Sequence, residues 1–188
     1  MMRIITGKAK GIKLRTLEGN ETRPTAERVK EAVFSMLQFD IEGRSVLDLF
    51  SGSGQMGLEA ISRGAQSATL IDRSREAIKI IEENARKTKL SDQCRIINSD
   101  ALEYLKRVKN EQFDIIFLDP PYASGLYTPV LKALLCEKCL KKNTIIVLES
   151  DIEDLINRDD ELSSAYEVKK TSRYSKTVIT LIGLKETI

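Results

Sequence analysis

Residues 46–57 decide the fold, and they read VLDLFSGSGQMG. A short apolar strand runs into a loop with three glycines, and a stretch with helical spacing follows. Glycines let the backbone approach a ligand closely, and the first turn of a helix offers unpaired N–H groups. In an open α/β sheet, ligands bind at the carboxyl ends of the strands, where this loop must lie. The stretch therefore predicts a binding site at one strand end of an α/β sheet.

The rest of the chain repeats this alternation of strand and helix. Further strands are predicted at residues 67–71, 94–98, 113–118 and 144–148. Short, continuous apolar strands are typical of a parallel sheet with helices on both faces. Residues 166–171 and 177–184 are separated by only a few residues, and they predict an antiparallel hairpin at one edge of the sheet.

The length of the chain, 188 residues, fits one domain with a substantial core. We expect residues 1–188 to form a single domain, in which residues 1–24 are an N-terminal arm and residues 25–188 are the catalytic core. Short apolar pieces around Gly7 and Gly11 predict a small β-hairpin in the arm.

The composition excludes several classes of protein. The hydrophobic fraction of 41% and the charged fraction of 31% are those of an ordinary globular protein. No apolar run approaches the roughly 20 residues that cross a bilayer, and the N-terminus does not resemble a signal peptide, so we expect a cytoplasmic protein without a membrane partner. With three cysteines and no histidine, neither a disulfide framework nor a zinc site is expected. Cys136 and Cys139 form a lone C-x-x-C pair, which we interpret as structural.

The glycine loop has two interpretations as a ligand site. The motif Gly52-x-Gly54-x-x-Gly57 matches the dinucleotide fingerprint, and Asp72 follows the next strand, where such sites hold a ribose hydroxyl. A nicotinamide-dependent dehydrogenase is therefore a competing hypothesis. Asp48 counts against it, because a carboxylate at the mouth of the loop repels a pyrophosphate. The same carboxylate suits a cationic ligand such as S-adenosylmethionine.

A second cluster of polar groups follows the strand at residues 113–118, which ends in Asp119-Pro120-Pro121-Tyr122. The two prolines make the segment rigid and leave its carbonyl groups without local partners. An aromatic amino group is a poor nucleophile, because its lone pair is delocalised into the ring. Two acceptors for its hydrogens return electron density to the nitrogen, and Asp119 and the Pro120 carbonyl can be these acceptors. Tyr122 can stack on the base, so the segment favours methyl transfer to an aligned amino group over a plain turn.

Four motifs occur in the order that is typical of class I methyltransferases, namely DLFSGSG at 48–54, LID at 70–72, SDA at 99–101 and DPPY at 119–122. The last is similar to the motif of amino-group methyltransferases that act on DNA, RNA or protein glutamine. Two further stretches, MRIITGK at 2–8 and RPTAERVKEAVF at 23–34, resemble the bacterial RsmD family of small-subunit ribosomal RNA guanine-N2 methyltransferases. The resemblance covers nearly the whole chain.

The resemblance implies a Rossmann-like class I methyltransferase fold, with seven mostly parallel strands, an antiparallel last strand and helices on both faces. It implies methyl transfer from S-adenosylmethionine to the N2 amino group of a guanosine in 16S rRNA, within the small ribosomal subunit or an assembly intermediate. The flipped base would meet residues 119–122. The residues expected to contact the cofactor are Asp48, Phe50, Ser51, Gly52, Ser53, Gly54, Asp72, Arg73, Asp100 and Ala101.

Basic residues gather in the N-terminal arm. The net charge is only +2, but the first fifteen residues hold five cations and no acid. Locally concentrated cations can follow a phosphate backbone even in a nearly neutral protein, whereas a solvated surface is the alternative interpretation. We expect RNA contacts from Arg3, Lys8, Lys10, Lys13, Arg15, Arg23, Thr25 and Arg28.

Two other functions remain open at this level. The first is methylation of another amino group, in DNA adenine or protein glutamine. A DNA enzyme would usually need a target-recognition domain, for which 188 residues leave no room, and a glutamine enzyme would more often carry Asn at position 119. The second is a non-catalytic RNA-binding module, which the intact loop acids and DPPY motif disfavour.

Overall fold

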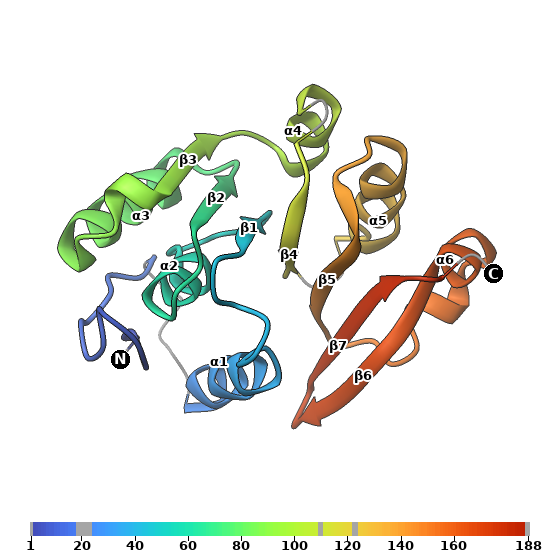
Figure 1. Ribbon diagram of the computed structural model, residues 1–188, viewed down its shortest axis with the longest axis horizontal. Coiled ribbons are helices and arrows are strands. Elements are labelled where there is room, and N and C mark those ends of the chain that lie inside the picture. The colour runs from blue at the N-terminus through green and yellow to red at the C-terminus, as the bar shows by residue number, and fades with distance from the viewer. Residues whose placement is uncertain (1, 18–23, 109–110, 122–123, 187–188) are drawn as a thin grey trace.

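The computed structural model describes residues 2–17, 24–108, 111–121 and 124–186. Its strands are β1 (Ser45–Asp48), β2 (Ser67–Asp72), β3 (Cys94–Asn98), β4 (Phe113–Leu118), β5 (Leu140–Ser150), β6 (Tyr166–Tyr174) and β7 (Thr177–Leu184). They form one sheet with the order β3-β2-β1-β4-β5-β7-β6 (Figure 1). Strands β1 to β5 are parallel, and β7 is antiparallel to both β5 and β6. The predicted seven-stranded sheet, its antiparallel last strand and the hairpin at its edge are confirmed.

Helices cover both faces of this sheet. They are α1 (Pro24–Met36), α2 (Gln55–Ser62), α3 (Arg75–Thr88), α4 (Ala101–Arg107), α5 (Tyr127–Cys136) and α6 (Asp160–Ala165), with short 3-10 turns at Ser91–Gln93 and Ile156–Arg158. Figure 1 shows α1, α2 and α3 on one side of the sheet and α4, α5 and α6 on the other. We call these two sides the α1–α3 face and the α4–α6 face.

Alternate residues of each central strand supply the cores of the two faces. In β4, Phe117 belongs to the hydrophobic cluster of the α1–α3 face, whereas Ile116 and Leu118 belong to that of the α4–α6 face. A strand buried on both sides needs apolar residues at every position, which explains the continuous apolar runs in the sequence.

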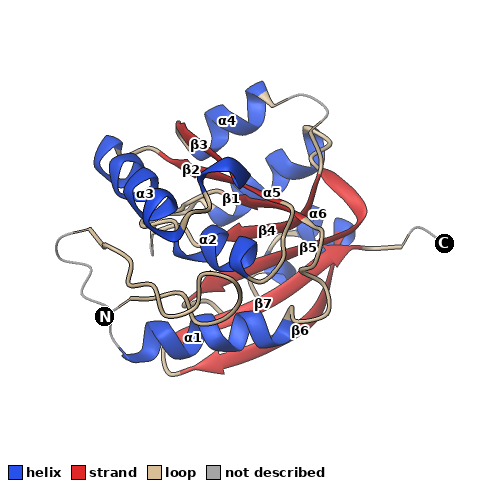
Figure 2. Ribbon diagram, turned by 60° about the vertical axis from the view of Figure 1, so that its left-hand side comes forward, coloured by secondary structure: helices blue, strands red, loops and turns tan. Residues whose placement is uncertain are grey.

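The N-terminal arm folds back on itself and packs on the α1–α3 face. Arg3 and Lys13 form an antiparallel bridge, and the N–H of Ile4 donates to the carbonyl oxygen of Ile12 at 3.0 Å. The predicted hairpin is thus present as an antiparallel pairing, but with a single bridge instead of extended strands. Ile4, Ala9 and Leu14 are buried in the same cluster as α1, α2 and α3, and Figure 2 shows the arm as a loop beside α1 and α2.

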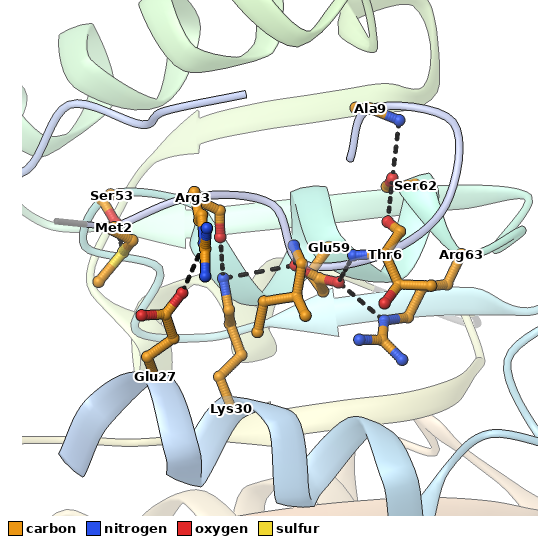
Figure 3. A network of polar contacts seen from close by, with 11 residues as sticks. Met2, Arg3, Thr6, Ala9, Glu27, Lys30, Ser53, Glu59, Ser62 and Arg63 are labelled. Carbon is orange, nitrogen blue, oxygen red and sulfur yellow. Dashed lines mark hydrogen bonds and ion pairs between the residues drawn. The ribbon is translucent and has the colours of Figure 1, made fainter. Parts of the chain in front are cut away.

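The fully buried side chain of Glu59 in α2 binds the main chain of the arm. Its carboxylate accepts the backbone N–H groups of Ile5 at 2.7 Å and Thr6 at 3.0 Å. Figure 3 shows the contact with Thr6. The Nε of Arg63 donates to the same carboxylate at 2.8 Å. These hydrogen bonds replace the partners that a strand neighbour would give the arm.

Lys30 of α1 supplies the opposite charge. Its Nζ lies 3.4 Å from Oε2 of Glu59 and donates a hydrogen bond to the carbonyl oxygen of Arg3 (Figure 3). Burial lowers the pKa of Lys30, and the neighbouring Glu59 carboxylate opposes that shift. Because Lys30 of α1 and Glu59 of α2 both hydrogen-bond the main chain of the arm, the network attaches the arm to both helices. Removal of one member of this buried ion pair would leave the other charge uncompensated.

Gly7→Ala should release part of the arm from α2. Gly7 has a φ of 87°, and an added Cβ would lie 1.7 Å from the backbone oxygen of Ser62. At Gly11 the φ is 84°, but no atom lies within 4 Å of an added Cβ, so Gly11→Ala carries only the backbone strain. By urea denaturation, we expect Gly11→Ala to lower the free energy of unfolding by about 1 kcal/mol and Gly7→Ala by at least ~2 kcal/mol more. Equal losses in the two variants would contradict the contact with α2.

Candidate active site

Acidic residues stand at, or directly after, the carboxyl ends of all five parallel strands. In the order of the strands across the sheet they are Asp100 after β3, Asp72 in β2, Asp48 in β1, Asp119 after β4 and Glu149 in β5. Because the carboxyl ends of parallel strands meet at one edge of a sheet, these acids line a single edge. Four of them were predicted as site residues, and Glu149 was not.

Strand register places three of these acids on one face of the sheet, with Asp119 and Glu149 level and Asp48 two residues before them. Asp48 is the partner of Phe117 in β4. Strands β4 and β5 pair through the residues immediately before Asp119 and Glu149. Side chains two residues apart share a face, so Asp48, Asp119 and Glu149 belong with Phe117 to the α1–α3 face. The glycine loop and α2 lie on this same face.

The glycine loop is held by its own main chain and by Asp72. The N–H of Ser51 donates to the carbonyl oxygen of Ile71, and the N–H of Gly52 donates to Oδ2 of Asp72, both at 2.9 Å. Gly54 begins α2 with a φ of 77° and no side-chain cap. An atom added at Cβ of Gly52 would meet nothing within 4 Å, so the loop faces open space at this residue.

Asp48 is a buried carboxylate with one oxygen that lacks a partner. The residue is 4% exposed, and among the described residues its Oδ2 has no hydrogen-bond partner. Burial raises its pKa to about 7, although backbone hydrogen bonds from Gly57 and Phe50 oppose the shift. A buried acceptor without a donor costs free energy, so this site suits a ligand that brings a positive charge or an N–H group.

Asp119 and Glu149 add two carboxylates beside Asp48. Asp119 is an exposed residue, but protein atoms surround its carboxyl group and partly desolvate it. This desolvation raises the pKa of Asp119 well above its usual range, and the charges of Glu149 and Asp48 raise it further. Desolvation also raises the pKa of Glu149 to about 7. Within the described part of the chain, no cation opposes either shift and neither carboxylate accepts a hydrogen bond.

The start of α5, which follows the segment after β4, is bonded to β5. The hydroxyl group of Tyr127, at the start of α5, donates to the carbonyl oxygen of Glu149 at 2.7 Å. Pro120 is buried and Pro121 is exposed, and the Pro121 carbonyl oxygen accepts the N–H of Ser124 at 3.1 Å. Tyr122 lies outside the described residues, so its predicted stacking role stays a prediction.

The remaining predicted cofactor residues surround the loop, with different contacts. Asp100 caps α4 by accepting the N–H groups of Leu102 at 2.9 Å and Glu103 at 3.4 Å, both through Oδ1, which leaves Oδ2 for a ligand. The hydroxyl group of Ser53 instead contacts Sδ of Met2 at 3.4 Å, so this side chain faces the arm. Among the other three, Arg73 is exposed, Ala101 is buried, and Phe50 packs on the α4–α6 face.

Asn84 of α3 joins the arm to the glycine loop. The side chain is fully buried, and its Nδ2 donates to the carbonyl oxygens of Ser53 and Arg15, each at 2.9 Å. Its Oδ1 accepts the N–H of Arg15 at 2.8 Å. The sequence contains a sign of this role, because Asn84 lies seven residues after Ala77 on the buried side of the helix. The arm therefore supports the loop directly.

The predicted RNA-contacting residues fall into two groups. Arg3 and Arg15 form surface ion pairs with acids of α1 and α3, at 2.8 and 2.7 Å, and Lys8 bonds the side chain of Gln93. Such exposed pairs contribute about 0–1 kcal/mol and are easily exchanged for phosphate contacts. The second group is exposed and has no ion pair or hydrogen bond with the described residues. It consists of Lys10, Lys13 and Arg28. Arg23 and the side chain of Thr25 lie outside what the structure describes.

The described residues contain neither a membrane-spanning helix nor a cluster of metal ligands. None of the helices there has the length and apolarity to cross a membrane, and no three potential ligand side chains, the strand-end acids included, could hold a metal ion. All three cysteines are free. Cys139 is buried, and desolvation raises its pKa to about 11, which makes the thiol unreactive.

Comparison with known proteins gives consistent matches over most of the chain. The family model described as "Conserved hypothetical protein 95" matches residues 2–182. "Ribosomal RNA small subunit methyltransferase D" of Escherichia coli (strain K12) is 36% identical over 153 residues, which cover 81% of this chain and 76% of that protein. The protein of the same name from Haemophilus influenzae is 38% identical over 153 residues, 80% of this chain and 79% of its own. The solved structure of "Putative methyltransferase yhhF" from Escherichia coli matches 99% of both chains with a TM-score of 0.85 and 30% identity.

Proposed function

This chain belongs to the RsmD family of methyltransferases, and on that basis we propose that it transfers a methyl group from S-adenosylmethionine to the N2 amino group of a guanosine in 16S rRNA. One observation carries the proposal. Three carboxylates, those of Asp48, Asp119 and Glu149, lie near the glycine loop, and no cation of the described residues balances them. A ligand with positive charge and N–H donors supplies what these acids lack.

The polar groups around the glycine loop fit S-adenosylmethionine. When bound, this cofactor supplies an electrophilic methyl group on a positively charged sulfur. Oδ2 of Asp48 needs a donor, and it suits the cationic methionine portion. Each oxygen of Asp72 already accepts one backbone N–H and retains a lone pair for a ribose hydroxyl. Oδ2 of Asp100 is an acceptor for the adenine amino group.

The segment after β4 fits the amino group that receives the methyl group. Asp119 and the carbonyl oxygen of Pro120 would each accept one hydrogen of that amino group, which returns electron density to its nitrogen. Once methylated, the nitrogen is cationic and acidic, and it passes a proton to Asp119. The raised pKa of Asp119 makes this carboxylate a proton acceptor suited to neutral pH. Tyr122 would stack on the base and hold it flat.

The N-terminal arm would bind the RNA around the target. Exposed Lys10 and Lys13 of the arm, with Arg28 of the adjoining α1, would meet the phosphate backbone first. Arg3, Lys8 and Arg15 would join by exchanging their surface partners. Because the arm contacts the glycine loop through Met2, RNA on the arm lies next to the active site. We place the reaction in the cytoplasm, on the small ribosomal subunit or an assembly intermediate.

Labelling of small subunits tests this function. Subunits from cells that lack the protein are incubated with the purified enzyme and tritium-labelled S-adenosylmethionine, and their RNA is digested to nucleosides. We expect the label in N2-methylguanosine, because the acceptor pair is built for an exocyclic amino group. Label in another nucleoside would overturn the choice of guanine, and label in the protein fraction would overturn RNA as the substrate.

A further inference from the structure

Glu149 is an acid that the cofactor and amino-group contacts leave unused. It is half-buried, and its carboxylate has no ion pair or hydrogen bond within the described part of the chain. The main chain at this residue is fixed, since its carbonyl oxygen accepts the hydroxyl group of the buried Tyr127 at 2.7 Å. A desolvated carboxylate without a partner costs free energy, so a fixed one at a strand end indicates a ligand contact.

Glu149 has an apolar neighbour on one adjacent strand and an acidic neighbour on the other. On the β7 side it pairs with Ile179, which is fully buried and apolar. On the β4 side it is level with Asp119, because the residues before the two acids pair in parallel register. Adjacent strands lie about 4.8 Å apart, so the two carboxylates can bind neighbouring atoms of one small group. Of the charged neighbours of Asp119, Glu149 raises the pKa of its carboxyl most.

Guanine is the nucleobase that offers two adjacent donor groups, N1–H and the N2 amino group. Adenine and cytosine instead place an unprotonated ring nitrogen beside their amino group, and a carboxylate opposite that nitrogen is repelled. These groups lie on the Watson–Crick edge of the base. Enzymes that flip a base out of a helix recognise it by hydrogen bonds to this edge. We infer that Glu149 accepts the N1–H of the target guanine while Asp119 accepts a hydrogen of its N2 amino group. This inference rests on the proposed function and makes Glu149 the residue that selects guanine.

2-Aminopurine riboside is the probe that separates these contacts. It keeps the N2 amino group, but its N1 has no hydrogen. After the methylated position has been mapped by labelling, small subunits are reconstituted on 16S rRNA that carries either guanosine or 2-aminopurine riboside there. We expect the wild-type enzyme to prefer guanosine by at least about 100-fold in kcat/KM, since sites built around a donor reject analogues that lack it.

Glu149→Gln should reduce this preference at least about 10-fold. The glutamine amide can donate its N–H to the unprotonated N1 of 2-aminopurine, so methylation of the analogue should rise while that of guanosine falls. A merely structural role for Glu149 would lower both rates alike and leave their ratio unchanged. An unchanged ratio in Glu149→Gln would therefore overturn the inference.

Asp151→Asn is the matched control, because Asp151 is an exposed acid two residues further on without a hydrogen bond or ion pair among the described residues. It should keep the wild-type preference, and loss of the preference in this variant would contradict a specific role for Glu149. Calorimetric affinity for S-adenosylhomocysteine should be the same in both variants. If the wild-type enzyme labels no RNA, the proposed function itself fails. If it labels guanosine and Glu149→Gln keeps the ratio, only the role of Glu149 fails.

Discussion

Asp119→Ala should lower kcat/KM for methyl transfer on the order of 10³-fold or more, while the protein still binds S-adenosylmethionine. The variant removes the acceptor that returns electron density to the amino nitrogen and later takes its proton. The residues around the glycine loop are left in place, because Asp119 forms no hydrogen bond with them. Single-turnover transfer of labelled methyl groups to small subunits measures the rate, and calorimetry measures the cofactor affinity.

Asp151→Ala is the control for this experiment, since it also removes one acid near the end of β5 but from an exposed position. It should methylate at the wild-type rate. If Asp119→Ala also turns over at the wild-type rate, the amino group is not activated by this carboxylate. If Asp119→Ala loses cofactor binding as well, the division between a cofactor loop and a target segment is wrong.

Asp48→Asn should weaken cofactor binding at least about 100-fold and should also make the fold more stable at neutral pH. The asparagine oxygen can still accept the backbone hydrogen bonds from Gly57 and Phe50. The buried charge, however, disappears, and with it the attraction for a cationic ligand. A variant that is more stable but unable to bind would show that Asp48 is kept for its ligand.

The stability gained in Asp48→Asn should depend on pH, because the pKa of Asp48 is raised in the folded protein. Folding raises that pKa from 3.8 to about 7, so the folded protein holds the proton more tightly than the unfolded chain. Wild-type stability therefore falls as the pH rises from about 4 to about 7, and the loss is complete above pH 7. A shift of this size corresponds to about 4 kcal/mol, since each pKa unit contributes about 1.4 kcal/mol.

Urea denaturation at two pH values checks this linkage. At pH 8 we expect Asp48→Asn to exceed the wild type in free energy of unfolding by about 2–4 kcal/mol, and the excess should shrink at pH 5. An equal excess at both pH values would show that the gain does not come from the Asp48 charge. Retention of wild-type cofactor affinity would contradict the role of this residue at the loop.

The order of elements and the position of the glycine loop could be predicted, because short apolar strands and helical spacing alternate along the chain. Strand ends were also predictable, and with them the acids at Asp48, Asp72, Asp100 and Asp119. Glu149 was missed, although it is the first charged residue after the apolar run of its strand. Its meaning depends on the register between β4 and β5, which sets it level with Asp119 and which no single stretch of sequence reveals.

The role of the N-terminal arm could be predicted only in part. Its cations are visible in the sequence and favour RNA binding. Its attachment is not visible, because Glu59 accepts the N–H of Ile5 across 54 residues of sequence and Asn84 accepts that of Arg15 across 69. These contacts make the arm part of the core and a support of the glycine loop. Deletion of the arm would therefore disturb both functions, so charge changes at Lys10 or Lys13 are the cleaner way to study RNA binding.

A calorimetric titration of the purified wild-type protein with S-adenosylmethionine decides whether the acids at the strand ends serve this cofactor. We expect saturable binding of one molecule per chain. The Oδ2 of Asp48 has no hydrogen-bond donor among the described residues, and the glycine loop at Gly52 leaves room for a cationic ligand. A titration with no saturable heat would contradict the assignment of the site and of the reaction built on it.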